Sequence, residues 1–338
     1  MHVGVIGSGN ISGTHTRAAL AIPGVAVSAV WGPTRDKAAR LAETAGAAAY
    51  DDLERFLEHK PMDVVLIGTP SGVHAEQAMA AARRGLHVLV EKPVDVQTAR
   101  IDRLIATVER AGVQAGVFFQ DRLKPDIVRL KELVTSGALG SLIFGAGRVP
   151  WYRPPEYYRD SRWRGTWSLD GGGALMNQGI HTVDVLQWLM GPVARLTART
   201  ATRLHDIEVE DTAVAVLEFA SGALGTIEAA TSIYPGYGRR VEVTGSNGTA
   251  VLEGDTLVKV DLRGGASSVS AAAAPTVAAS SPLVADASAH QRILQDFLDA
   301  IAAGRAPVVD LREGRRSVAI VEAIYGSAQD GGAPYVLR

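Results

Sequence analysis

The 338-residue sequence contains no cysteine. This absence excludes disulfides, iron–sulfur clusters, thiolate zinc sites and cysteine nucleophiles, and it suits a reducing compartment. No apolar run approaches the roughly 20 residues that a helix needs to span a bilayer, and residues 1–6 lack the charged start of a signal peptide. We therefore expect a cytoplasmic protein with no membrane partner. The formal net charge of -2 comes without a basic stripe, which argues against a nucleic-acid partner.

Short apolar runs alternate with helical patterns through the first third of the chain. The expected strands are 2–6, 25–31, 63–67, 86–90 and 113–118, and the expected helices are 11–21, 35–45, 72–84 and 97–111. Near-continuous apolar runs such as 63–67 are typical of strands that are buried on both faces. The alternation predicts βαβ units and a doubly wound parallel sheet, an α/β Rossmann domain over residues 1–120.

The pattern changes after residue 120. A strand is expected at 142–149, an irregular loop at 151–170 and a helix at 173–190. Further strands are expected at 193–204, 211–219, 223–231, 240–245 and 248–260. Strands that follow one another without helices predict an α+β domain over 121–338 with a large open, mostly antiparallel sheet.

The end of the sequence contains two further kinds of segment. Residues 262–287 are rich in Ala, Ser and Gly, show no period, and indicate a surface excursion inserted into the second domain. Two final helices, 288–303 and 312–328, close the chain. We expect these helices to be able to pack back on the first domain.

A glycine-rich turn, Gly7-Ser8-Gly9-Asn10-Ile11-Ser12, joins the first expected strand to the first expected helix. In dinucleotide-binding proteins the first glycine permits a tight turn, and the second lets a pyrophosphate approach the helix N-terminus. The third position is Ser12, which is small enough for close helix–sheet packing. The βαβ setting therefore predicts a dinucleotide site. The residues expected to meet the cofactor here are Gly7, Gly9, Asn10 and Ile11.

The second expected strand ends without the usual acidic residue. NAD-binding proteins commonly carry Asp or Glu there to accept hydrogen bonds from the adenosine ribose, whereas this sequence has Trp31-Gly32-Pro33-Thr34-Arg35. Without that carboxylate a 2′-phosphate is not repelled, and Thr34 and Arg35 could receive it. Arg35 is equally compatible with a solvated position at a helix start. The sequence therefore predicts NAD(P) with a slight preference for NADP, and with Trp31, Thr34 and Arg35 at the cofactor.

Several motifs in fixed order carry a family resemblance. They are Leu86-His87-Val88-Leu89-Val90-Glu91-Lys92-Pro93, Thr69-Pro70-Ser71-Gly72-Val73-His74, and the 171–184 segment GGGALMNQGIHTVD. The glycine turn and the segment Gly304-Arg305-Ala306-Pro307 near the end belong to the same set. With these motifs in this order, the sequence resembles the glucose–fructose oxidoreductase, inositol dehydrogenase and rhizopine-catabolism (Gfo/Idh/MocA) family. The resemblance covers nearly the whole chain, apart from 262–287.

The resemblance implies an enzyme that transfers hydride between nicotinamide and a hydroxyl-bearing carbon of a sugar or cyclitol. It implies that His181 is the acid/base or a substrate ligand, of which we expect the acid/base, and that Lys92 polarises the reacting oxygen. Inositol dehydrogenases carry Asp at the position of Asn177; because Asn cannot take a proton, we expect Asn177 to orient a substrate hydroxyl instead. An imidazole suits the first role because it titrates near neutral pH. Further cofactor contacts implied by the resemblance are Thr69, Pro70, His74, Glu91, Lys92 and Gln120.

Asn177, His181 and Asp184 are spaced i, i+4 and i+7 in the expected helix 173–190, which would place them on one face. Asp184 either orients His181 or packs as a structural residue. Only one of these side chains is a strong nitrogen ligand, and the spacing fits no standard zinc pattern, so we expect no metal here.

Aromatic and arginine side chains are concentrated in the loop at 151–170. Aromatic rings stack on sugar C–H surfaces, and Arg forks bind hydroxyls, carboxylates or phosphates. The loop therefore predicts substrate contacts from Trp163 and Arg164, and weaker ones from Tyr152. The alternative is a loop whose aromatic residues belong to the core.

Three functions remain open at this point. The first is a sugar or cyclitol dehydrogenase, or the reductase that runs in reverse. The second is a dehydrogenase of a nucleotide-linked sugar acid, suggested by the segment from Trp163 to His181. The third is a non-catalytic cofactor-binding regulator, against which the presence of both Lys92 and His181 argues. The resemblance also implies a homodimer or homotetramer.

Overall fold

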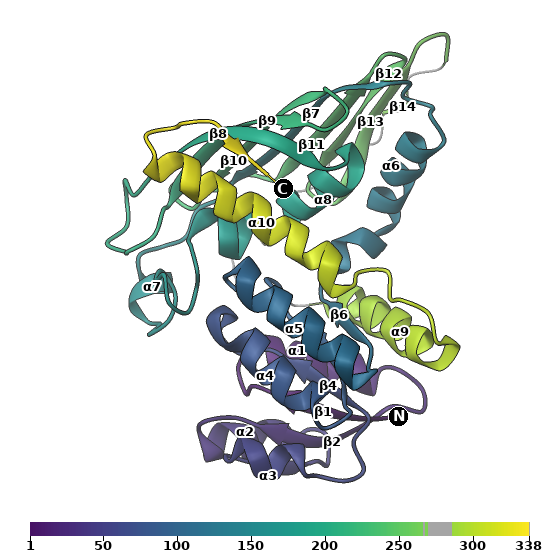
Figure 1. The fold of residues 1–338 in the computed structure, drawn as a ribbon, viewed down its shortest axis with the longest axis vertical. Helices are drawn as coiled ribbons and strands as arrows, with labels where there is room; N and C mark the ends of the chain where they lie inside the picture. Colours follow the sequence, from purple (N-terminus) through teal and green to yellow (C-terminus); the bar gives the residue numbers. More distant parts are fainter. Residues whose placement is uncertain (266–267, 270–285, 338) are drawn as a thin grey trace. The chain divides into compact units, whose positions relative to one another are not determined.

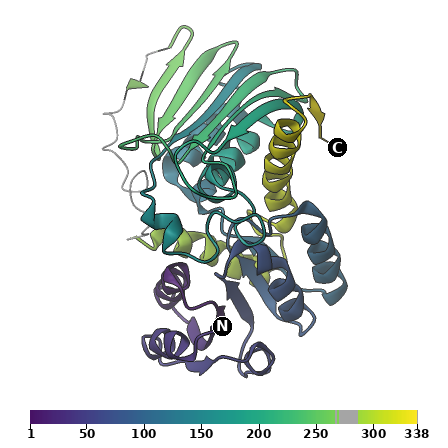
Figure 2. The ribbon, with the colours of Figure 1, turned by 90° about the vertical axis from the view of Figure 1, so that its left-hand side faces the viewer.

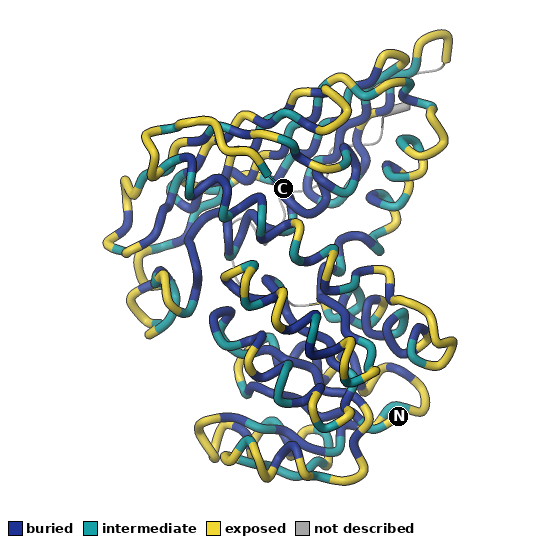
Figure 3. The backbone as a smooth tube through the Cα atoms, in the orientation of Figure 1, coloured by how far each residue is buried: buried dark blue, intermediate teal, exposed yellow. Residues whose placement is uncertain are grey.

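The computed structural model describes residues 1–265, 268–269 and 286–337, and the chain divides into two compact units (Figure 1). The first unit comprises Met1–Gln120 with Leu283–Arg315, and the second comprises Asp121–Pro282 with Arg316–Arg338. Each unit has its own sheet and its own buried interior (Figure 3). No helix in the described part of the chain combines the length and the apolarity needed to cross a membrane.

The first unit contains a six-stranded parallel sheet in the order β3-β2-β1-β4-β5-β6. Its strands are β1 His2–Ile6, β2 Ala26–Trp31, β3 Ala48–Tyr50, β4 Val64–Ile67, β5 His87–Val90 and β6 Ala115–Val117. All four residues of β4 are buried, as its continuous apolar run requires. The strand order reverses between β1 and β4, and ligands of doubly wound sheets bind at such a switch point, beyond the carboxyl ends of the strands. The predicted Rossmann architecture is confirmed.

Helices of the first unit cover the sheet. They are α1 Asn10–Leu20, α2 Arg35–Glu43, α3 Leu53–Leu57, α4 His74–Ala82, α5 Thr98–Ala111 and α9 Ser288–Ala303, with the short helix η1 Ser71–Val73 before α4 and η2 Gln120–Leu123 at the boundary of the unit. Helix α4 packs against α5, and α1 packs against α9. The sequence did not predict β3 or α3, because both are too short to show a clear period.

The second unit is built on a nine-stranded sheet in the order β14-β13-β12-β11-β7-β10-β9-β8-β15 (Figure 2). Its strands are β7 Leu142–Pro150, β8 Val193–Ala201, β9 Thr212–Phe219, β10 Leu224–Ala230, β11 Arg240–Gly245, β12 Gly248–Glu253, β13 Thr256–Leu262, β14 Ser268–Val269 and β15 Tyr335–Val336. Strands β7 and β10 run parallel, whereas β8–β9, β9–β10, β7–β11 and β11–β12 are antiparallel. The predicted α+β domain with a mostly antiparallel sheet is confirmed.

Helices of the second unit lie on one face of this sheet (Figure 1). They are α6 Pro125–Thr135, α8 Ile180–Met190 and α10 Leu311–Gln329, with the four-residue α7 Glu156–Arg159 in the loop after β7. The other face exposes apolar side chains that alternate with buried ones along the strands. They include Val214, Val216 and Leu224, which occupy positions of the same face on β9 and β10.

Two predicted elements differ from the structure. The helix expected at 173–190 is a π-helical turn, Ala174–Gly179, followed by α8. Apolar periodicity over six residues does not separate a π turn from an α turn. The strand expected at 248–260 is a hairpin, since β12 and β13 pair across the turn at Gly254, whose φ is +61°. Most of the excursion predicted at 262–287 lies outside the described residues.

Candidate functional site

The glycine turn follows β1 and begins α1. Gly7 has φ +119°, and its N–H donates to the Trp31 carbonyl at 2.8 Å. A Cβ at Gly7 would lie 2.5 Å from Ser12 Oγ and 2.6 Å from the Gly68 carbonyl oxygen, so the first position requires glycine. Ser12 Oγ donates to the same Gly68 carbonyl at 3.2 Å, which ties α1 to the residue after β4. The serine at the third motif position therefore has a structural role.

Gly9 is different, because nothing in the described protein requires it to be glycine. Its φ of -92° is open to other residues, and a Cβ there would meet no described atom within 4 Å. Gly9 is the N-cap of α1, and the first helical turn, residues 10–13, contains no acidic residue. Open space before unneutralised helix N–H groups fits the pyrophosphate of a dinucleotide. Residues Asn10 and Ile11, also predicted to meet the cofactor, occupy this turn.

The end of β2 gives a steric reason for the missing acidic residue. A Cβ on Gly32 would lie 2.4 Å from Ser8 Oγ and 2.8 Å from Ser8 Cβ, so a carboxylate cannot be placed at position 32 without moving the glycine turn. Thr34 and Arg35 are exposed at the start of α2. Arg35 Nη1 lies 3.3 Å from Asp51 Oδ1 in an exposed ion pair. The Nε1 of half-buried Trp31 has no hydrogen-bond partner among the described residues.

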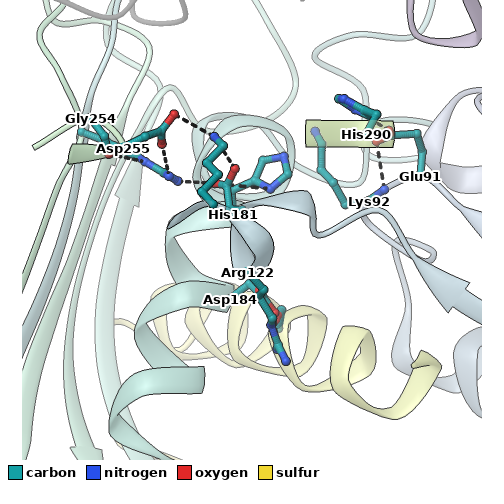
Figure 4. Close-up of polar contacts among 12 residues, drawn as sticks. Glu91, Lys92, Arg122, His181, Asp184, Gly254, Asp255 and His290 are labelled. Carbon is teal, nitrogen blue, oxygen red and sulfur yellow. Dashed lines mark hydrogen bonds and ion pairs between the residues drawn. The ribbon is translucent and has the colours of Figure 1, made fainter. Parts of the chain in front are cut away.

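The residues after β5 hold a buried carboxylate. Glu91 Oε1 lies 3.0 Å from His15 Nε2 and 3.5 Å from His290 Nε2, and Oε2 accepts the backbone N–H of Lys92 at 3.1 Å (Figure 4). Burial by itself would raise the pKa of Glu91, but the hydrogen bonds from both histidines outweigh burial and hold that pKa well below its usual range. Burial lowers the pKa of His15. Glu91 is therefore an ionised carboxylate that fixes the backbone of Lys92.

The same three side chains are of the types that bind metal ions, and their ligand atoms lie within 4.8 Å of one another. Metal-bound histidines normally donate their second ring N–H to an acceptor. The Nδ1 atoms of His15 and His290 are buried with no hydrogen-bond partner in the part of the chain that the structure describes. The geometry is that of a hydrogen-bonded carboxylate.

The other predicted cofactor residues of the first unit surround these strand ends. Thr69 and Pro70 follow β4, and the Thr69 hydroxyl donates to Gln77 Oε1 at 2.6 Å. His74 begins α4 and is buried, with Nε2 2.8 Å from the Thr69 carbonyl oxygen and Nδ1 2.8 Å from the Pro93 carbonyl oxygen. Gln120 lies just beyond β6, and its Oε1 is buried without a partner among the described residues. These segments come together beyond the carboxyl ends of β4, β5 and β6.

In the second unit, Asn177 lies in the π turn. Its Nδ2 donates to Asp170 Oδ1 at 2.7 Å, and Asp170 Oδ2 accepts the Gly165 N–H at 2.8 Å. The start of the turn is held by Glu210, whose carboxylate accepts the N–H groups of Gly173 and Leu175 at 2.9 and 2.8 Å. Because Asn177 belongs to a π turn, the α-helical spacing expected between Asn177 and His181 does not apply.

His181 is the second residue of α8 and lies beside a buried charge network. Its Nδ1 is 3.9 Å from Asp121 Oδ2, and Asp121 is paired with Arg239 at 2.5 Å and Lys124 at 2.6 Å (Figure 4). Burial would raise the pKa of Asp121, but the charges of Arg239, Lys124 and His181 outweigh burial and hold it well below its usual range. Asp255 extends the network by pairing with both cations. His181 therefore lies beside an ionised carboxylate.

Asp184 has a different set of partners. Its two oxygens accept a forked pair of bonds from Arg122, at 2.8 Å from Nε and 2.7 Å from Nη2, and Oδ1 also accepts from Ser317 Oγ at 2.9 Å (Figure 4). Both members of the pair are almost completely buried. These contacts favour the structural alternative for Asp184, since they link α8 to η2 and α10.

The loop after β7 forms an aromatic and cationic cluster. The guanidinium of Arg164 lies 4.1 Å from the centroid of the Tyr157 ring and 5.5 Å from that of Trp163. The guanidinium of Arg153 lies 5.5 Å from the centroid of the same Tyr157 ring. Burial lowers the pKa of Arg153, and the charge of Arg164 lowers it further by a smaller amount. Tyr152, also predicted to contact substrate, packs edge-on against Tyr234 with ring centroids 5.2 Å apart.

Five residues of these networks were not predicted from the sequence: Asp121, Arg239, His15, His290 and Glu210. A usable signal existed for His15, which lies one helical turn beyond the glycine turn, and for Asp121, which closely follows the last strand of the first unit. Arg239 and His290 come from distant parts of the sequence, and their positions depend on tertiary structure that no local pattern reports.

A parallel sheet with a glycine turn at its switch point and an open helix N-terminus are the features of a dinucleotide-binding Rossmann domain. Residues 1–119 match the oxidoreductase family with an NAD-binding Rossmann fold, and residues 127–251 match the GFO/IDH/MocA C-terminal domain. The chain belongs to the Gfo/Idh/MocA family of oxidoreductases, as the sequence resemblance predicted.

Individual relatives are similar over most of the chain. The myo-inositol 2-dehydrogenase of Thermotoga maritima is 31% identical over 73% of this chain and 74% of the relative. The D-xylose 1-dehydrogenase (NADP(+)) 2 of Haloferax volcanii is 30% identical over 88% of each chain. Among solved structures, the WlbA dehydrogenase of Bordetella pertussis in complex with NADH and UDP-GlcNAcA has a TM-score of 0.88 and 30% identity, covering 100% of this chain and 99% of that one.

Proposed function

We propose that the protein transfers a hydride between NAD(P) and the hydroxyl-bearing carbon of a sugar, a sugar derivative or a cyclitol. The observation that carries this proposal is the Glu91-Lys92-Pro93 segment, in which a buried, ionised carboxylate fixes the backbone of Lys92 beyond the end of β5. Relatives named for myo-inositol and D-xylose support the substrate class. The nicotinamide cofactor supplies the hydride acceptor.

The side chains of this chain would manage the proton and the oxygen. As the hydride leaves carbon, the hydroxyl proton must pass to a base, which we assign to His181. The ionised Asp121, 3.9 Å from His181 Nδ1, stabilises the imidazolium that results. Lys92 would donate to the reacting oxygen and stabilise the developing alkoxide charge. Asn177 cannot take a proton, and it orients a substrate hydroxyl in this proposal.

The test is a screen of sugars and cyclitols for reduction of NAD or NADP by the purified protein, followed by variants on the best substrate. We expect Lys92→Ala and His181→Ala each to lower turnover about 100-fold or more, with little change in NADH affinity. Lys60→Ala, an exposed lysine of the same unit, serves as the control. Wild-type turnover in Lys92→Ala would remove that residue from the mechanism, and no turnover on any polyol, sugar acid or nucleotide sugar would favour a regulator.

A specific observation favours a second candidate, a dehydrogenase of a nucleotide-linked sugar acid. Arg153 and Arg164 approach the same Tyr157 ring, and an anionic ligand would relieve the repulsion between their guanidinium groups. The similarity to WlbA, solved with UDP-GlcNAcA, supports this candidate. Arg164→Ala should then weaken turnover of a UDP-linked uronic acid more than that of the neutral UDP-sugar, whereas Arg159→Ala, an exposed control on α7, should change neither. Equal effects on both substrates would count against this candidate.

We further propose that the cofactor site accepts NADP, with a slight preference for it over NAD. With glycine at position 32, no carboxylate repels a 2′-phosphate. Exposed ion pairs such as Arg35–Asp51 stabilise a protein by only about 0–1 kcal/mol, so Arg35 can release Asp51 and bind a phosphate instead. Dissociation constants of NADPH and NADH measure the preference. Asp51→Asn should tighten NADPH binding and Arg35→Ala should weaken it, with NADH little affected; a strong wild-type preference for NADH would refute the proposal.

The uncovered face of the second unit's sheet is a candidate contact for a homodimer or homotetramer. Apolar side chains at its centre, including Val216 and Leu224, are about half exposed. Light scattering of the wild type and of Val216→Asp would test this, since a charge on the interface should dissociate the assembly. A monomeric wild type would contradict the proposal.

A further inference from the structure

His74 stands out among the buried side chains of the first unit because both of its ring nitrogens face oxygen atoms that can only accept. Nε2 is 2.8 Å from the Thr69 carbonyl oxygen and Nδ1 is 2.8 Å from the Pro93 carbonyl oxygen, and the residue is 1% exposed. A backbone carbonyl has no proton to give. A neutral imidazole would therefore place one nitrogen lone pair against an oxygen lone pair at hydrogen-bond distance.

His15, in the same unit, shows the opposite pattern. Its Nε2 meets the Glu91 carboxylate at 3.0 Å, whereas its Nδ1 has no hydrogen-bond partner in the described part of the chain. One proton satisfies that arrangement, and burial lowers the pKa of His15, which favours the neutral ring. The two histidines are thus distinguished by the atoms that surround them: one ring needs one proton and the other needs two.

The surroundings of His74 include a buried carboxylate. Asp95 caps the start of α4 by accepting the N–H of Ala75, the residue after His74, at 3.2 Å. Arg100 lies 3.7 Å from Asp95 and donates to the Gly72 carbonyl at 2.8 Å.

We propose that His74 is a buried imidazolium that positions Lys92. Its two N–H groups join the Thr69 carbonyl, in the segment after β4, to the Pro93 carbonyl, one residue beyond Lys92. Glu91 fixes the N–H of Lys92 on one side, and His74 fixes the carbonyl of Pro93 on the other. With both nitrogens committed to backbone oxygens, His74 acts on the cofactor site through the two segments that it joins. The positioning of Lys92 for turnover rests on the function proposed above, whereas the protonation state of His74 does not.

The protonation state can be measured without any substrate. In protein labelled with ¹⁵N on its histidine rings, both nitrogens of His74 should show the shifts and one-bond protons of an imidazolium at pH 7 to 8. His15 should show one protonated nitrogen. His74→Gln assigns the signal by its disappearance, and if that variant does not fold, variants of the other seven histidines assign it by elimination. A neutral His74 ring at pH 7 would overturn the proposal, whatever the enzyme's substrate.

The positioning role needs a kinetic readout. A glutamine can donate to one of the two carbonyls but not to both, so His74→Gln should lower kcat about 10-fold or more while KM and the NADH dissociation constant change less than about 3-fold. His2→Gln, a half-exposed histidine of β1, is the matched control and should behave as the wild type. If the NMR shows an imidazolium but His74→Gln keeps wild-type kcat, the positioning role is wrong. Absence of any turnover in the wild type would instead contradict the proposed function.

Discussion

Glu210 makes the stability of the second unit depend on pH in an unusual direction. Its carboxylate is fully buried and accepts hydrogen bonds from the N–H groups of Gly173 and Leu175 and from the Tyr325 hydroxyl at 3.0 Å. Burial outweighs these bonds and raises the pKa of Glu210 to about 7, from an ordinary value of 4.5. A raised pKa means that the folded protein binds the proton more tightly than the unfolded chain does.

The direction and size of the effect follow from proton linkage. Between pH 4.5 and pH 7 the folded state carries more protons at Glu210, so the free energy of unfolding falls as pH rises through this range. The stabilisation is fully present below pH 4.5 and is lost above pH 7. The pKa of Glu210 rises from 4.5 to about 7 on folding. At about 1.36 kcal/mol per pKa unit, this residue changes the free energy of unfolding by on the order of 3 kcal/mol over that pH range.

Glu210→Gln removes the ionisation and should remove this pH dependence. Four of the five tryptophans lie in the second unit, at positions 151, 163, 167 and 188, so tryptophan fluorescence during urea unfolding reports mainly on that unit. Between pH 4.5 and pH 8.5, the free energy of unfolding of the wild type should fall by about 3 kcal/mol relative to that of the variant. Glu218→Gln, in an exposed ion pair with Arg195, is the control and should keep the wild-type slope. If Glu210→Gln keeps that slope too, the reasoning is refuted.

Three further perturbations separate binding, stability and catalysis. Gly9→Val should lower the free energy of unfolding by no more than about 1 kcal/mol, because its Cβ meets open space and only the N-cap preference is lost. It should weaken NADH binding at least about 10-fold by filling the expected pyrophosphate position, and equal NADH affinity by titration would contradict this. Asp184→Asn should destabilise the second unit by about 3–5 kcal/mol in urea unfolding, since it leaves the buried Arg122 charge without its carboxylate. Asp121→Asn should lower kcat about 10-fold and change the pH dependence of kcat. An unchanged pH dependence would show that Asp121 does not influence the protonation of the catalytic base.

The architecture was predictable where burial imposes a pattern. Strand β4 is apolar along its whole length, and β5 is apolar after His87, because both faces of a parallel sheet are covered; the resulting apolar runs are visible in the sequence. The glycine turn and the Glu-Lys-Pro segment could also be predicted, because each consists of residues that are adjacent in sequence. The fold and the family are confirmed, while the roles of Lys92, His181 and Asn177 stay predictions.

The features that sequence reasoning missed depend on distant contacts or on small changes of backbone geometry. The apolar residues of Ala174–Gly179 would suit an α turn as well as the π turn that they form. The start of this turn is fixed by Glu210, which is distant in sequence and accepts the N–H of Gly173. The neighbour of His181 is Asp121, 60 positions away, rather than the nearby Asp184 that the spacing suggested as an option. Both oxygen atoms that face the His74 ring nitrogens belong to the backbone, so no side-chain pattern reveals them.

The close packing of Gly32 against Ser8 has a consequence for how cofactor preference can evolve in this chain. An acidic residue at position 32 is the shortest route to strict NAD use in a Rossmann domain, yet its Cβ would collide with the glycine turn that holds the cofactor. An acidic residue at position 32 would therefore have to be accompanied by a change at Ser8. Selection by single steps would act instead through exposed positions such as Arg35, where a substitution disturbs no buried contact.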